Sequence, residues 1–90
     1  MKTFQLIVSG RVQGVNYRRY VVEMAEALNY VGYVQNLSNG EVLVVVNAQY
    51  EEDLEFFISK LYDGSMFSNV ESVACEKIDF SEFTTFTKRG

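Results

Sequence analysis

Hydrophobic and polar residues alternate near the start of the chain and then change their period. Alternation over residues 3–9 predicts a strand, in which Ile7 interrupts the polarity of one face, as in a strand covered on both faces. Apolar residues then recur at steps of four, three and four from Tyr17 to Leu28, which predicts one face of a helix. The intervening residues 10–16 follow neither period and are predicted to form a loop.

Two strands joined by a tight turn are predicted next. They cover Val31–Leu37 and Glu41–Ala48, and Ser38-Asn39-Gly40 between them indicates a turn because Asn-Gly tolerates positive φ. The second strand contains an uninterrupted apolar run, Val42–Val46, which is typical of a strand at the centre of a sheet.

A second helix and further strands complete the pattern. Acidic residues gather at positions 51–55, where negative charge suits a helix N-terminus, and an apolar stripe follows as far as Leu61. Gly64 is predicted to end this helix. Residues 72–80 predict a fourth strand with the uneven alternation of a bulge, and residues 83–87 a short fifth strand or a terminal extension.

The order of these elements, β-α-β-β-α-β, has one common compact solution. We expect an α+β fold of the ferredoxin-like type, a split β-α-β sandwich in which two helices cover one face of an antiparallel sheet. Right-handed crossovers make the strands at 3–9 and 31–37 parallel, with 41–48 between them. Their C-terminal ends then share one edge of the sheet, which places the loop 10–16 beside Asn36.

The composition fits a single small domain spanning residues 1–90. The chain is 48% hydrophobic and 14% aromatic, enough for a core, and has no proline to mark a linker. A single cysteine, Cys75, excludes an internal disulfide, and the lack of histidine excludes His-based triads and His-ligated metal sites. No segment predicts a signal peptide or a membrane span, so we expect no membrane partner and a location in the cytoplasm, and we expect a monomer.

Charge is distributed unevenly along the chain. The formal net charge of −4 argues against nucleic acid as a partner. The first acidic residue is Glu23, however, and every charged residue before it is basic, so this part of the chain would attract an anionic ligand. The basic residues concerned are Lys2, Arg11, Arg18 and Arg19.

The predicted loop and the start of the predicted helix carry the composition of an anion-binding site. The segment Gly10–Arg19 contains two glycines that loosen the backbone, followed by a guanidinium at Arg18. N–H groups at a helix N-terminus bind oxyanions, and arginine adds a planar charge that matches two oxygens at once. Taken alone, an arginine here is more often a solvated helix residue, and the glycines are more often turn residues.

Two motifs of the chain resemble those of the acylphosphatase family. The first, Gly10–Arg18, matches Gly-Arg-Val-Gln-Gly-Val, a variable residue, an aromatic and Arg. The second, Gly32–Asn36, matches Gly, aromatic, Val, any residue and Asn, with Gly40 in the tight turn that follows. Length and element order also fit, so the resemblance covers essentially the whole domain.

The resemblance implies an enzyme that hydrolyses the carboxyl–phosphate bond of acyl phosphates to a carboxylate and inorganic phosphate. It implies that Arg18 and the amides of a phosphate-binding loop hold the phosphoryl group, and that Asn36 orients the attacking water. It also implies no metal and no other cofactor, with a small acyl phosphate as substrate and inorganic phosphate as product and inhibitor. The loop residues are Arg11, Val12, Gln13, Gly14, Val15 and Asn16.

The chain departs from the family's pattern at three places. Asn16 stands where a small residue such as glycine is frequent, although it also tolerates the left-handed conformation. Leu37 follows the key asparagine where threonine is frequent, so turnover would fall if that threonine fixes the asparagine or the water. The chain carries Lys88-Arg89-Gly90 where the family has a short aromatic strand, a difference that we expect to concern stability more than chemistry.

Other functions use the same kind of fold, among them RNA-recognition modules, small-ligand regulatory domains and metal chaperones. RNA recognition needs stacking aromatics and a basic surface, whereas Val42–Val46 has no aromatics and the chain is acidic. A metal chaperone needs a pair of cysteines, and only Cys75 is present. An acylphosphatase-like domain that binds anions with poor turnover stays open, given Leu37 and Asn16.

Overall fold

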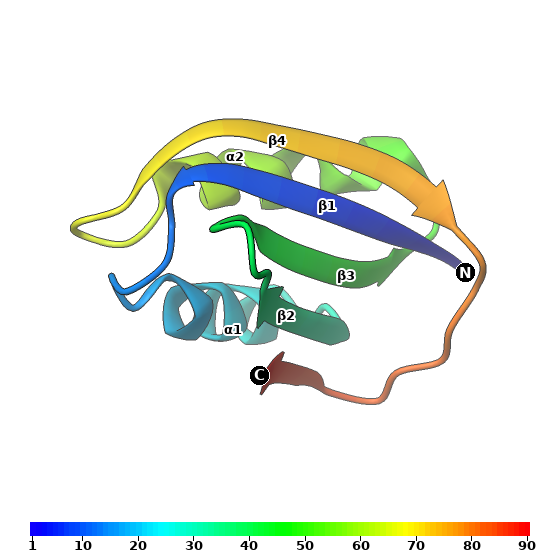
Figure 1. The fold of residues 1–90 in the computed structure, drawn as a ribbon. Coiled ribbons are helices and arrows are strands. Elements are labelled where there is room, and N and C mark those ends of the chain that lie inside the picture. The colour runs from blue at the N-terminus through cyan, green and yellow to red at the C-terminus, as the bar shows by residue number, and fades with distance from the viewer.

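In the computed structural model, which describes residues 1–90, two helices pack on one face of a five-stranded sheet (Figure 1). This confirms the predicted α+β fold of the ferredoxin-like type. In chain order the elements are β1 (Lys2–Arg11), α1 (Tyr17–Ala27), β2 (Gly32–Asn36), β3 (Val42–Ala48), a 3-10 turn η1 (Glu51–Leu54), α2 (Glu55–Asp63), β4 (Asn69–Ile78) and β5 (Phe86–Arg89).

The order of the strands brings the ends of β1 and β2 to one edge of the sheet, as predicted. The order is β4-β1-β3-β2-β5, and β3 lies antiparallel to both β1 and β2, which therefore run in the same direction. Val8 of β1 and Asn36 of β2 both face Val42 of β3. Asn36 is thus level with the last part of β1, just before that strand passes into the loop at Val12.

The sheet is mixed, so the prediction of an antiparallel sheet is wrong for its fifth strand. The chain leaves β4 at one edge, crosses the end of the sheet and returns at the other edge (Figure 1). It then pairs with β2 in parallel, from Gly32 opposite Phe86 to Gln35 opposite Arg89. The strand begins later than predicted because Phe83 belongs to the connection, where its ring lies 5.8 Å from that of Tyr33.

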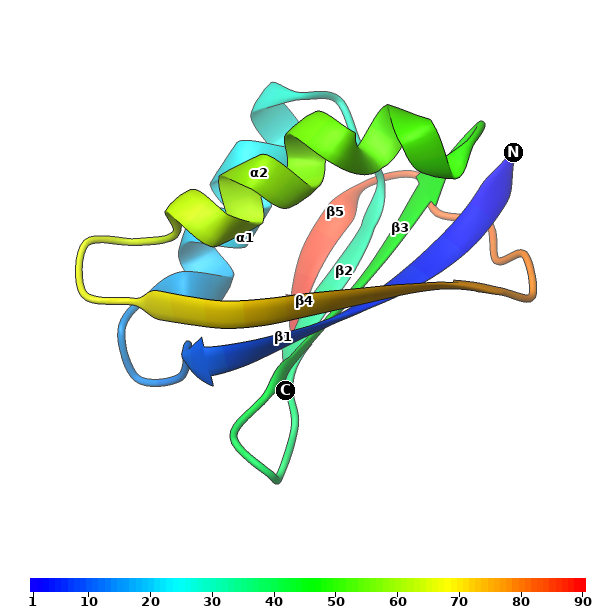
Figure 2. The same ribbon diagram turned by 90° about the horizontal axis from the view of Figure 1, so that it is seen from above.

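The hydrophobic core lies between the sheet and the two helices, which Figure 2 shows together on one side of the strands. Alternate residues of β1 and β3 face this core, as the strand patterns predicted, and each fully buried side chain stabilises the fold by about 2 kcal/mol. The largest contributions from the helices are the buried rings of Tyr17 and Phe57. The strand residues concerned are Phe4, Leu6, Val8, Val42, Val44 and Val46.

No helix covers the other face of the sheet, so the expectation from Ile7 of a strand covered on both faces is wrong (Figure 2). Only the connection between β4 and β5 packs there, near the start of β1. The Thr3 hydroxyl donates to the Asn47 side chain (2.7 Å) and accepts from the N–H of Ser81 (2.9 Å). The Asn47 amide donates in turn to the Ser81 carbonyl (3.0 Å), so these buried polar groups are satisfied and fix the path toward β5.

The bulge predicted within residues 72–80 is not there, because the pairing of residues 72–78 with β1 is regular; the irregularity lies just before them, where β1 leaves the sheet. The pairing of β1 with β4 shifts between Ser9 and Gly10, and it continues to Asn69, which explains why β4 starts earlier than predicted. Gly10 has φ 125°, and a Cβ there would collide with the carbonyl oxygen of Asn69. Only glycine fits this position, and it turns the chain from β1 toward the loop.

No helix of the structure is both long and apolar enough to cross a membrane.

Candidate active site

A cavity of about 240 Å³ lies where the loop after β1 and the start of α1 meet β2 and β5. Both residues predicted to carry the chemistry, Arg18 and Asn36, line it, and so do basic residues from two different elements. No acidic side chain lines the cavity, so its local charge is opposite in sign to that of the whole chain. The lining residues are Val12, Gly14, Asn16, Tyr17, Arg18, Arg19, Asn36 and Lys88.

The backbone of the loop leaves a series of N–H groups without partners inside the protein. Gly14 and Asn16 adopt left-handed conformations, with φ 72° and 59°, so Asn16 takes the place of the usual glycine as expected. None of the N–H groups of residues 12–16 donates a hydrogen bond within the protein, and the first in α1 to do so is that of Tyr20. Such a run of donors ending at a helix N-terminus binds anions.

Two other loop residues hold the loop in place instead of lining the cavity. The side-chain amide of Gln13 donates to the carbonyls of Leu37 (2.8 Å) and Glu41 (2.9 Å), which ties the loop to the turn between β2 and β3. The carbonyl of Val15 accepts from the Ser65 hydroxyl (2.8 Å). These contacts preorganise the backbone donors.

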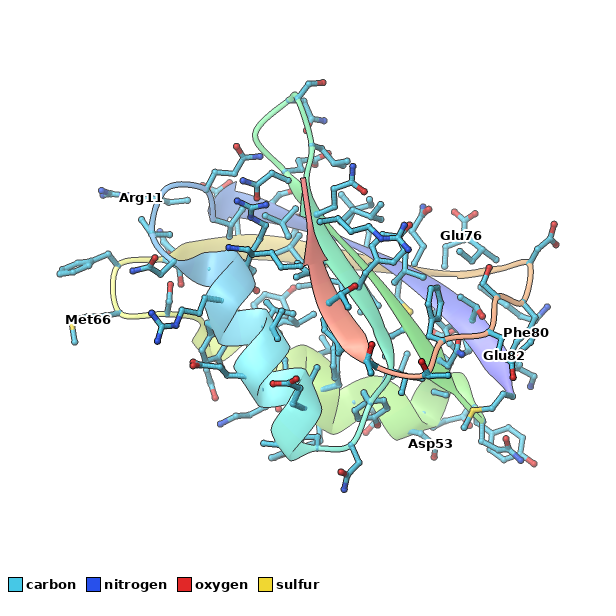
Figure 3. The ribbon with its side chains drawn as sticks, turned by 90° about the horizontal axis from the view of Figure 1, so that it is seen from below. Arg11, Asp53, Met66, Glu76, Phe80 and Glu82 are labelled. Carbon is cyan, nitrogen blue, oxygen red and sulfur yellow. The ribbon has the colours of Figure 1, made fainter.

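The side chain of Arg11, also predicted as part of the phosphate-binding loop, does not line the cavity. It is exposed and extends from the loop away from the rest of the molecule (Figure 3). Any contribution of Arg11 to a bound anion therefore comes from its backbone or from its charge at a distance.

Arg18 carries a charge that no acidic side chain balances. Its Nη1 atom donates to the backbone carbonyl of Arg89 in β5 (2.7 Å), a contact that fixes the guanidinium against the end of the sheet. Arg18 takes part in neither of the two ion pairs of the protein, one of which joins the neighbouring Arg19 to Glu23 at 3.5 Å. Arg18 is thus held by a neutral acceptor, with its remaining N–H groups available to a ligand.

Asn36 places a buried acceptor at the cavity. Its Oδ1 is the only buried side-chain nitrogen or oxygen of the protein without a hydrogen-bond partner. Buried polar atoms are nearly always paired, so an exception at a cavity indicates a place for a ligand or a water. The residue lies at the end of β2, at the edge of the sheet that carries the loop, as the topology predicted.

The aromatic residue of the first motif is structural and un-ionised. Tyr17 is buried beneath the cavity and its hydroxyl donates to the carbonyl of Leu61 (2.8 Å). Burial raises the pKa of Tyr17 well above its ordinary value, so the phenol stays protonated at neutral pH and does not serve as a base. Tyr33 of the second motif lies outside the cavity lining, where the guanidinium of Arg89 stacks on it at 3.6 Å.

The sequence analysis missed Lys88, which it assigned with the end of the chain to stability. The structure places Lys88 in the cavity wall, because β5 runs beside β2 and ends next to the site. Alternate residues of a strand share a face, so Lys88 lies on the same face of β5 as the buried Phe86. This signal identifies Lys88 as a site residue only when the position of β5 is known. No group of three or more Cys, Asp or Glu side chains lies close enough to hold a metal ion.

Comparisons with known proteins agree with the site. A family model described as Acylphosphatase matches residues 4–88. The chain is 34% identical over 86 residues to an acylphosphatase of Vibrio parahaemolyticus, covering 96% of this chain and 94% of that one. It is 39% identical over 69 residues to an acylphosphatase of Clostridium perfringens (77% and 76% covered). The crystal structure of acylphosphatase from Bacillus subtilis superposes over the full length of both chains with a TM-score of 0.90, at 28% identity.

The family match includes both motifs and the whole lining of the cavity, from Val12 to Lys88. The agreement extends over most of the length of each relative and over every element of the fold. The chain therefore belongs to the acylphosphatase family and is an enzyme that hydrolyses acyl phosphates.

Proposed function

We propose that Arg18 and the backbone amides of the phosphate-binding loop, residues 11–16, bind the phosphoryl group, and that Asn36 orients the attacking water. The observation that carries the proposal is the buried, unpartnered Oδ1 of Asn36 in a cavity that also receives the unbalanced charge of Arg18. An acceptor at this position binds one hydrogen of a water and leaves the water's lone pair free to attack phosphorus.

The two residues would act on opposite sides of the reacting phosphorus atom. Arg18 approaches from α1, where its guanidinium matches two phosphoryl oxygens and the loop N–H groups meet the others. Asn36 approaches from β2. Phosphoryl transfer needs the attacking and leaving oxygens roughly in line, so the acyl group would point away from Asn36 and out of the cavity.

The reaction proposed here needs no general base from the protein. The chain has no histidine, no carboxylate lines the cavity, and burial keeps Tyr17 protonated. The leaving group of an acyl phosphate is a carboxylate, which departs without protonation, so catalysis rests on positioning and charge stabilisation. Water oxygen bonds to phosphorus, the bond to the acyl oxygen breaks with its electrons on the carboxylate, and the water's proton passes to a phosphoryl oxygen or to solvent.

We also propose a metal-independent monomer of one domain over residues 1–90 that acts in the cytoplasm. Metal independence is supported by the absence of histidine from the chain and of carboxylate side chains from the cavity lining.

Turnover of benzoyl phosphate is expected to continue unchanged in the presence of a chelator, and inorganic phosphate is expected to inhibit competitively. Product phosphate presents the same oxygens to Arg18 and the loop as the substrate does. Steady-state kinetics with EDTA and with increasing phosphate would check both expectations. Metal independence would be contradicted if EDTA removes the activity and a divalent cation restores it. If phosphate lowers kcat without raising KM, it binds outside the cavity.

Leu37→Thr is expected to change kcat by less than about threefold, the scale of a substitution away from the chemistry. The side chain at this position does not line the cavity, and its backbone N–H and carbonyl are already bonded to Glu41 and Gln13. Comparison of kcat for benzoyl phosphate in the two proteins is the measurement. A larger rise would mean that leucine beside the asparagine limits this enzyme, as its departure from the family's threonine suggests.

A further inference from the structure

We propose that Lys88 is a second anion-binding residue, whose ammonium binds the phosphoryl group of the substrate, and product phosphate, together with Arg18. This inference rests on the proposed function, because it concerns the same cavity. It adds a cation from the sheet side to a cavity whose other lining cations, Arg18 and Arg19, both come from α1.

The position of Lys88 follows from the pairing of β5. Lys88 stands opposite Val34 in the parallel pairing of β5 with β2. Val34 precedes Asn36 by two residues in β2, so Lys88 lies near Asn36. Phe86 lies on the same face of β5 and is only 4% exposed, beneath the helices. The side chain of Lys88 therefore projects on the helix-covered face, where it lines the cavity.

The neighbouring basic residues Arg89 and Arg19 already have interaction partners within the protein. Arg89 projects on the opposite face, where its guanidinium stacks on Tyr33. Arg19 forms an ion pair with Glu23. Lys88, like Arg18, takes part in neither ion pair of the protein, although acidic residues outnumber basic ones by twelve to eight. A phosphoryl dianion in the cavity would thus meet two uncompensated cations, Arg18 from the helix side and Lys88 from the sheet side.

The chemistry of the ammonium sets the size of the expected effect. Lys88 is exposed at the mouth of the cavity, and a hydrated point charge there contributes less than a guanidinium that binds two oxygens. Loss of one such exposed charge contact is expected to weaken phosphate binding by about fivefold. The loss should be larger for the phosphate dianion than for the monoanion, because attraction to the ammonium grows with the ligand's charge.

Calorimetric titration of the full-length protein with inorganic phosphate tests this inference, at about pH 8 and about pH 5.5, on either side of phosphate's second ionisation. Lys88→Met is expected to raise Kd about fivefold at the higher pH and less at the lower, and Lys88→Arg to restore most of the binding. Lys77→Met is the matched control. It removes the same charge from the far end of the sheet, where Lys77 pairs with Phe4, and should leave Kd unchanged.

Kinetics with benzoyl phosphate should follow the binding data, with KM raised by Lys88→Met more than kcat is lowered. The inference is overturned if Lys88→Met binds phosphate like the wild type, or if Lys77→Met weakens binding equally. Phosphate binding by Arg18→Met shows whether only the role of Lys88 fails or the proposed function fails as well. If Arg18→Met abolishes phosphate binding and Lys88→Met does not change it, only the role of Lys88 fails; if Arg18→Met still binds normally, the proposed function fails too.

Discussion

Arg18→Lys is expected to lower kcat/KM for benzoyl phosphate by about a thousandfold, the upper end of the loss of one preorganised charged donor. Lysine keeps the charge but not the planar fork that matches two phosphoryl oxygens, and its ammonium would not reproduce the hydrogen bond to the Arg89 carbonyl together with contacts to the ligand. The fold should be unaffected, because the side chain lies at the cavity and contributes nothing to the core. Steady-state kinetics and thermal melting of both proteins provide the measurement.

Arg11→Lys is the control for this substitution. It makes the same chemical change in the same motif, but on a side chain that points away from the molecule (Figure 3). Its kcat/KM should stay within about threefold of wild type, as expected for a surface change. If Arg11→Lys and Arg18→Lys lose activity equally, the position of the Arg18 guanidinium in the cavity does not explain the loss, and the special role of Arg18 is contradicted.

Asn36→Ala is expected to lower kcat by about a hundredfold, with little change in KM. The substitution removes the acceptor that we assign to the water, while Arg18 and the loop still bind the phosphoryl group. The stability of the protein, in contrast to kcat, should not fall. Because Oδ1 is buried without a partner, its removal should leave the free energy of unfolding unchanged or raise it by about 1 kcal/mol.

Gln35→Ala is the matched control for Asn36→Ala. It deletes an amide from the preceding residue of β2, which projects on the opposite face of the sheet and does not line the cavity. The kcat of this variant should stay near that of the wild type. Retention of full kcat by Asn36→Ala would remove the water-orienting role, and a large loss of stability would mean that Asn36 is held by contacts that the structure lacks.

The part of the site formed by β1, α1 and β2 could be predicted from the sequence. Two rules sufficed: the change of hydrophobic period located the loop before Tyr17, and the handedness of a crossover made β1 and β2 parallel. Together they place Asn36 beside the loop without any knowledge of side-chain contacts. The left-handed conformation of Asn16 was predictable as well, since few other residues adopt it.

The contribution of β5 could not be predicted in the same way. Its position depends on pairing with β2, about fifty residues earlier in the chain, and on the connection that Thr3, Asn47 and Ser81 hold over the open face. Neither leaves a local pattern in the sequence. The sequence predicts a strand that includes Phe83, whereas the ring of Phe83 packs the connection against Tyr33. Lys88 reaches the cavity only because β5 lies at this edge of the sheet.

The hydrogen bond between Arg18 and the carbonyl of Arg89 joins residues 71 positions apart, and it makes the cavity depend on the placement of β5. β5 is four residues long and pairs with a single neighbour, β2, at the edge of the sheet. Short edge strands open at a lower free energy than the core. A molecule with its core intact but β5 detached would be folded by most measures. It would nevertheless lose the hydrogen bond that holds the arginine we propose for phosphoryl binding, so enzymatic activity would report correct folding more strictly than compactness does.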